Sequence, residues 1–143
     1  NKLSIRQLQR SNMTALIVVR HSERFDEVDK AAWRKHLNTE ESNGARKSCK
    51  HDPIISPSDG VAYAKEVAAT LKLMPEVSNS ILPVKIYSSR MRRAVQTASI
   101  IAMELRLPVY LSAGLAQIVP DVKKSKGKFE FADNAELERL CAG

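Results

Sequence analysis

A histidine flanked by arginines follows an apolar run near the start of the chain. Five consecutive polar residues, 20–24, place His21 between Arg20 and Arg24. A neutral imidazole is a nucleophile, and guanidinium groups bind the oxygens of phosphate or carboxylate, often bidentately. The stretch is therefore suited to meet an anion. The alternative interpretation, from composition alone, is a solvated polar loop that follows a strand.

The apolar run that precedes the histidine predicts the element that positions it. Residues 14–19 read TALIVV, a β-branched-rich run of the length expected for a strand buried on both faces. In an open parallel sheet, ligands bind just beyond the carboxyl ends of the strands. The pattern therefore places His21 at a ligand-binding edge of a sheet.

A strand–helix–strand pattern later in the chain brings another arginine to the same edge. Residues 81–87 predict a strand, residues 91–105 a helix with an apolar face, and residues 108–112 a third strand. Arg93 lies in the first turns of that helix, where free amides and the helix dipole favour anions, so we expect it to face His21. The order of elements indicates an α/β fold with a mostly parallel sheet flanked by helices.

The remaining segments are assigned from the same kinds of pattern. Ser58 is the predicted N-cap of a helix with apolar residues spaced over 61–71, which packs on the sheet. Residues 27–51 are polar and predict a loop excursion, in which His36 and His51 are surface histidines. The outer segments are a lead-in at 1–13, a solvated basic loop at 123–128 and a short terminal helix at 135–142.

Length and composition are those of one ordinary globular domain, 1–143. Apolar residues make up 43% of the chain and charged residues 27%, with no apolar run long enough to cross a membrane and no signal-peptide pattern. Cys49 and Cys141 suggest free thiols in a reducing compartment, hence a cytoplasmic protein. The net charge of +7 favours an anionic partner, either a phosphorylated substrate or nucleic acid.

Three segments resemble the histidine phosphatase superfamily, also called phosphoglycerate mutase-like. Residues 19–24, VRHSER, resemble its RHG signature, and residues 52–64 resemble its D-x-P-L-T/S…G…A segment. Residues 87–98, YSSRMRRAVQTA, resemble its Y-S-S…R-A-x-Q-T-A segment. The three occur in the family's order over about residues 15–118. The first is most similar to phosphatase-type members.

The resemblance implies a phosphomonoester hydrolase. By motif match, His21 attacks phosphorus to form a phosphohistidine, Arg20 and Arg93 bind the phosphoryl oxygens, and Ser89 or an amide near it adds a donor. The implied partner is a phosphorylated substrate or phosphate. No metal and no organic cofactor is implied.

The sequence departs from the family pattern at the proton donor that protonates the leaving group. Gln117 aligns where the family carries a carboxylate, and an amide cannot act as an acid. Asp121 is the nearest substitute in sequence, and Glu23 or Asp26 could serve from the other side.

Further departures concern a second histidine and a glycine. All three histidines lie at or before position 51, so the family's late histidine has no match. Ser22 replaces the usual glycine, and serine resists some conformations that glycine tolerates. We expect an incomplete copy of a longer domain, or a degenerate member. The alternative function is a non-catalytic phosphate-binding or interaction module, and nucleic-acid binding through a basic surface is disfavoured.

Overall fold

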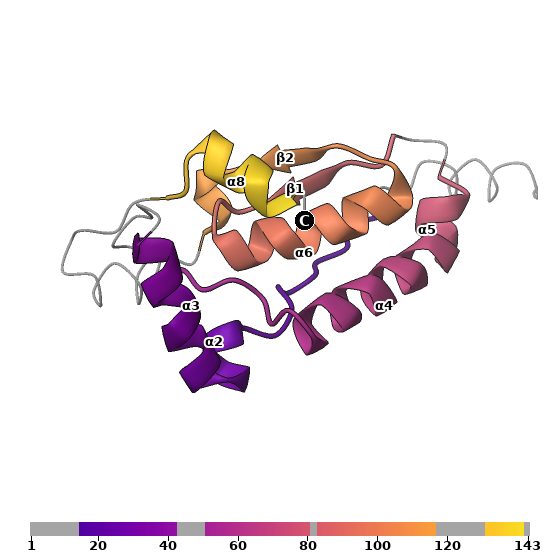
Figure 1. Cartoon of the computed structure of the whole chain (residues 1–143). Coiled ribbons are helices and arrows are strands. Elements are labelled where there is room, and N and C mark those ends of the chain that lie inside the picture. Colours follow the sequence, from indigo (N-terminus) through magenta and orange to yellow (C-terminus); the bar gives the residue numbers. More distant parts are fainter. Residues whose placement is uncertain (1–14, 43–50, 81–82, 117–130, 142–143) are drawn as a thin grey trace, which may run out of the picture.

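The computed structural model describes residues 15–42, 51–80, 83–116 and 131–141 (Figure 1). Its elements in chain order are α2 (Phe25–Val28), α3 (Lys30–Ser42), α4 (Asp59–Leu73), α5 (Pro75–Ser78), β1 (Ile86–Ser88), α6 (Arg92–Leu105), β2 (Val109–Leu111), the 3₁₀ turn η2 (Ala113–Leu115) and α8 (Asn134–Cys141).

Helix α6 is the centre of the fold. It contacts α4, α8 and both strands, and in Figure 1 it lies between the strands and α4. Its buried residues include Val95, Ala98 and Ile101, whose three-residue spacing keeps them on one side of a helix. Arg106 ends the helix in the left-handed conformation with φ 55°, and the Leu107 amide then donates to the Ala102 carbonyl at 2.9 Å.

The two strands form a small parallel sheet. Ile86 pairs with Val109, Tyr87 with Tyr110 and Ser88 with Leu111, joined by the crossover helix α6. This is the mixed α/β class expected from the sequence, although the described residues are mainly helical. The strand predicted at 81–87 begins only at Ile86 within them, since 83–85 lie outside any strand and 81–82 are outside the described residues.

The predicted buried strand at 14–19 is wrong over 15–19, and residue 14 lies outside the described residues. Residues 15–20 belong to no helix or strand and are all exposed, with Leu16 at 88% and Val18 at 83% exposed. A β-branched run becomes a strand only when cross-strand neighbours and burial stabilise it. The only sheet in the described part of the chain consists of β1 and β2, and residues 15–19 pair with neither strand.

The predicted loop at 27–51 is also wrong over much of its length, because α2 and α3 occupy it up to Ser42. Trp33 is 4% exposed, and its ring stacks on His36 at 5.4 Å and meets Phe25 edge-on at 5.9 Å. Three aromatic rings thus anchor a helix whose other residues are mostly polar, which hides its period from a pattern search. His36 and His51 are both partly buried, so the prediction of surface histidines holds only in part.

The other predicted helices are confirmed. Helix α4 covers the predicted 58–71 region, and α8 covers the predicted terminal helix up to Cys141. Ser58 occupies the N-cap position of α4, but its side chain makes no capping bond. The lead-in 1–13 and the basic loop 123–128 lie outside the described residues. None of the described helices is long and apolar enough to cross a membrane.

Candidate functional site

Three bonds anchor the backbone next to His21. The Ser22 amide donates to Thr97 Oγ1 on α6 at 3.0 Å, and the Ser22 hydroxyl donates to the Gly60 carbonyl on α4 at 2.7 Å. The Ser22 carbonyl accepts a bond from His21 Nδ1 at 2.8 Å. Serine in place of the usual glycine is therefore accommodated, and its hydroxyl adds a contact that glycine could not make.

A short backbone pairing extends this anchoring beyond Ser22. The Ser56 amide donates to the Glu23 carbonyl at 2.8 Å and the Phe25 amide to the Ile54 carbonyl at 3.0 Å. These bonds bring the start of α4 so close that a Cβ on Gly60 would lie 2.8 Å from the Glu23 carbonyl oxygen. Glycine is required there by space. We call residues 20–24, held in this way, the histidine loop.

A buried carboxylate fixes the N-terminus of α6. Both oxygens of Asp52, which is 0% exposed, accept from the Arg92 amide at 2.9 and 3.1 Å. One of them also lies 3.5 Å from the guanidinium of Arg93, itself 4% exposed. Negative charge at a helix N-terminus is favourable because it meets free amides and the positive end of the helix dipole. Asp52 therefore holds both the first turn of α6 and the guanidinium of Arg93.

The imidazole of His21 is held in one tautomer. A carbonyl oxygen only accepts hydrogen bonds, so Nδ1 carries the proton that bonds to Ser22, and Nε2 of the neutral ring keeps its lone pair. Partial burial lowers the pKa of His21 below its usual 6.5, and the charges of Arg93, Arg20 and Arg24 lower it further, against the Ser22 carbonyl, which raises it. These effects favour the neutral form of the ring at pH 7.

The other predicted site residues have varied positions. Arg20 is exposed beside His21. Ser89 is buried, and its hydroxyl accepts from the Met91 amide at 3.4 Å. Gln117 and Asp121 lie outside the described residues.

Glu23 and Asp26, the other candidate proton donors, differ in exposure and in their contacts. Glu23 is exposed, whereas both Asp26 oxygens bond to Arg24, at 2.7 and 3.0 Å. Of the two, only Glu23 has an exposed side chain that is not held in this bidentate pair.

Sequence reasoning missed three residues that build the site. Asp52 and Thr97 belong to the segments that carry the family resemblance, but nothing in the sequence indicates which groups they contact. The sequence shows Ser22 only as a departure from glycine. Only the folded backbone shows that Ser22 and Thr97, 75 positions apart, are bonded.

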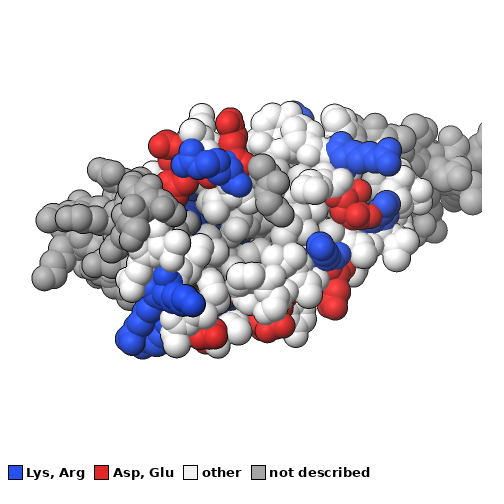
Figure 2. Space-filling view, in the orientation of Figure 1, with Lys and Arg blue, Asp and Glu red and all other residues white. Residues whose placement is uncertain are grey.

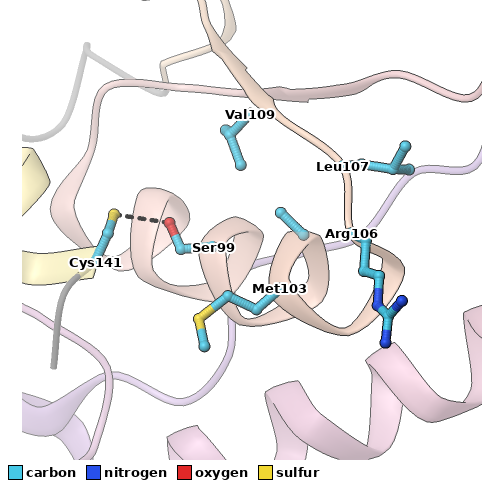
Figure 3. A pocket seen from close by; sticks show the side chains of 7 residues that line it. Ser99, Met103, Arg106, Leu107, Val109 and Cys141 are labelled. Atoms are coloured by element: carbon cyan, nitrogen blue, oxygen red, sulfur yellow. Dashed lines mark hydrogen bonds between the residues drawn. The ribbon is translucent and has the colours of Figure 1, made fainter.

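Two shallow hollows lie away from the histidine loop, on the side formed by α6, β2 and α8. The larger, of about 390 Å³, is lined by Ser99, Ala102, Met103, Arg106, Leu107, Val109 and Cys141 (Figure 3). At one end the side chains of Ser99 and Cys141 are hydrogen-bonded at 2.7 Å. Neither hollow is lined by His21 or Arg93.

The charged groups form neither a metal centre nor a single basic face in the view drawn. Within the described residues, no group of three or more histidine, cysteine or acidic side chains is placed to hold a metal ion. In Figure 2, basic and acidic side chains of the described part of that face lie interspersed.

A comparison of the sequence with known protein families identifies the family to which the chain belongs. The family model of the histidine phosphatase superfamily (branch 1) matches residues 16–128. The chain therefore belongs to the histidine phosphatase superfamily. No curated protein matches it significantly.

Proposed function

We propose that this protein is a phosphomonoester hydrolase that acts through a phosphohistidine at His21. The observation that carries the proposal is the bond from His21 Nδ1 to the Ser22 carbonyl, which directs the Nε2 lone pair away from the backbone. The lowered pKa keeps that lone pair available at neutral pH. Arg20 and Arg93 are the proposed cations for the phosphoryl oxygens of a phosphorylated substrate.

The proposed reaction has two displacements at phosphorus. Nε2 of His21 forms a bond to phosphorus as the bond to the leaving oxygen breaks, and that oxygen takes a proton from an acid or from water. Water then attacks phosphorus, the phosphorus–nitrogen bond breaks, and phosphate leaves with the neutral imidazole restored. Guanidinium groups stabilise the charge on the equatorial oxygens in both steps.

The test is hydrolysis of para-nitrophenyl phosphate from pH 4 to 8. Para-nitrophenolate leaves without a proton donor, so this substrate tests the nucleophile alone. We expect His21→Ala to lower kcat/KM at least about 10³-fold, because it removes the nucleophile. The matched control, His36→Phe, keeps ring packing on Trp33 and should retain activity. Equal rates for wild type and His21→Ala would contradict the proposal.

The pH profile follows from the direction of the pKa shift. Only neutral His21 attacks, so kcat/KM should be level above about pH 6.5 and fall at lower pH, as the ring takes up a proton below its usual pKa. A profile that begins to fall well above pH 6.5 would contradict this protonation state. Comparison with glycerol phosphate, whose alkoxide needs a proton, then tests for a general acid.

A second candidate is a non-catalytic module that binds phosphate. It is favoured by the Asp52 carboxylate, which pairs with the Arg93 guanidinium that would bind the phosphoryl group. It predicts phosphate binding by calorimetry, weakened by Arg93→Ala, without turnover of either substrate.

We also propose a cytoplasmic location, because the two cysteines form no disulfide-framework pattern.

A further inference from the structure

One side chain connects the histidine loop to the helix that carries Arg93. Thr97 is 4% exposed, and its hydroxyl oxygen accepts the Ser22 amide bond at 3.0 Å. The same hydroxyl donates to the Arg93 carbonyl one turn earlier in α6, at 2.9 Å. A hydroxyl has one proton and two lone pairs, so both bonds form at once.

These bonds connect to the imidazole through the backbone of Ser22. His21 Nδ1 donates to the Ser22 carbonyl, the Ser22 amide donates to Thr97, and Thr97 donates to the Arg93 carbonyl. The backbone that orients the ring and the backbone that carries the guanidinium therefore share one buried hydroxyl. A shift at that hydroxyl changes the position of one relative to the other.

We propose that Thr97 is a positioning residue, which sets the tautomer and orientation of His21 relative to Arg93. This rests on the proposed function for its effect on turnover, but the tautomer is a property of the unliganded protein. The contact is specific to the hydroxyl, because the methyl group of threonine can make neither bond.

The decisive variants are Thr97→Val, which keeps the shape and removes the hydroxyl, and Thr97→Ser, which keeps it. We expect Thr97→Val to lower kcat for para-nitrophenyl phosphate about 10- to 100-fold, since misplacement of about 1 Å costs up to about 10²-fold. Thr97→Ser should remain within about threefold of wild type. KM should change less than kcat in both.

Thr70→Val is the matched control. The Thr70 hydroxyl makes the same bond one turn back, to the Glu66 carbonyl at 2.9 Å, but it is exposed on α4 and does not touch the histidine loop. It should leave kcat unchanged. If kcat of Thr70→Val fell as far as that of Thr97→Val, the loss would follow from removing any helix hydroxyl and not from losing the bond to Ser22. That result would overturn the proposal.

The second readout is the His21 tautomer, measured by ¹⁵N NMR of the ring. Wild type and Thr97→Ser should show predominantly protonated Nδ1, and Thr97→Val should move toward the mixture of a free imidazole. This measurement needs no turnover. If wild type hydrolyses nothing, the proposed function fails while the tautomer comparison still decides the role of Thr97.

Folding is checked for each variant by circular dichroism. If Thr97→Val does not fold, Thr97→Ala replaces it, because alanine and serine at this position differ only by the hydroxyl. A Thr97→Ala protein with the wild-type tautomer would overturn the proposal. So would a loss of activity that Thr97→Ser shares, since that loss would then follow the methyl group.

Discussion

Two neighbouring segments, one apolar and one polar, differ in how firmly the rest of the structure holds them. Residues 16–19 are apolar and exposed, whereas the polar histidine loop directly after them is fixed by bonds to α4, to α6 and to residues 54–56. Apolar character alone does not determine burial. What fixes the histidine loop is the pairing of its backbone groups and the close approach of Gly60, and these need partners that segment 16–19 lacks among the described residues.

Among the substitutions that test this comparison, Asp52→Asn should lower the free energy of unfolding most. It removes the charge beside buried Arg93, and loss of one partner of a buried pair costs about 3 kcal/mol in the free energy of unfolding. Urea denaturation measures it. Glu104→Gln is the control, since Glu104 pairs with Lys72 in solvent and should change little. Equal effects of the two substitutions would show that Asp52 does not hold α6.

Gly60→Ala should be next in size. Its Cβ would meet backbone at 2.8 Å, so overpacking should cost about 2 kcal/mol, although alanine normally stabilises a helix. Gly114→Ala is the control, because the nearest neighbour of its Cβ would be 3.7 Å away. Thermal unfolding of both proteins checks the difference. A more stable Gly60→Ala protein would contradict the close approach of the histidine loop to α4.

The smallest effect should come from the exposed segment. The double substitution of Leu16→Ser with Val18→Ser should change the free energy of unfolding by no more than about 0.5 kcal/mol, as expected at exposed positions. Ile55→Val, at a residue 1% exposed, should cost about 1 kcal/mol by comparison. A larger loss in the double variant than in Ile55→Val would mean that residues 16–19 are buried in solution.

Patterns of apolar spacing predicted the helical part of the fold well. The face of α6 and the extent of α4 follow from apolar residues repeated every three or four positions, and α8 agrees with the short terminal helix expected at 135–142. The same method failed at α3, where burial depends on Trp33 and its ring contacts rather than on a repeated apolar face. It failed at 14–19 because strand formation depends on neighbours that the segment itself does not specify.

The sequence predicts His21, Arg20 and Arg93 as site residues from motif and position, and their chemical roles stay predictions. Burial lowers the pKa of His21, and the charges of Arg93 and Arg20 lower it further, so both guanidinium groups act on the imidazole. The carboxylate of Asp52 and the hydroxyls of Ser22 and Thr97 act through long-range contacts. Such contacts leave no local signature in the sequence.

The two anchors of Ser22 also bear on how the chain folds. They join positions 38 and 75 residues apart, and each doubling of a loop adds only about 0.6 kcal/mol of closure entropy. The longer closure is thus only slightly more costly than the shorter one. Neither contact has to precede the other, so the histidine loop can be captured first by α4 or first by α6.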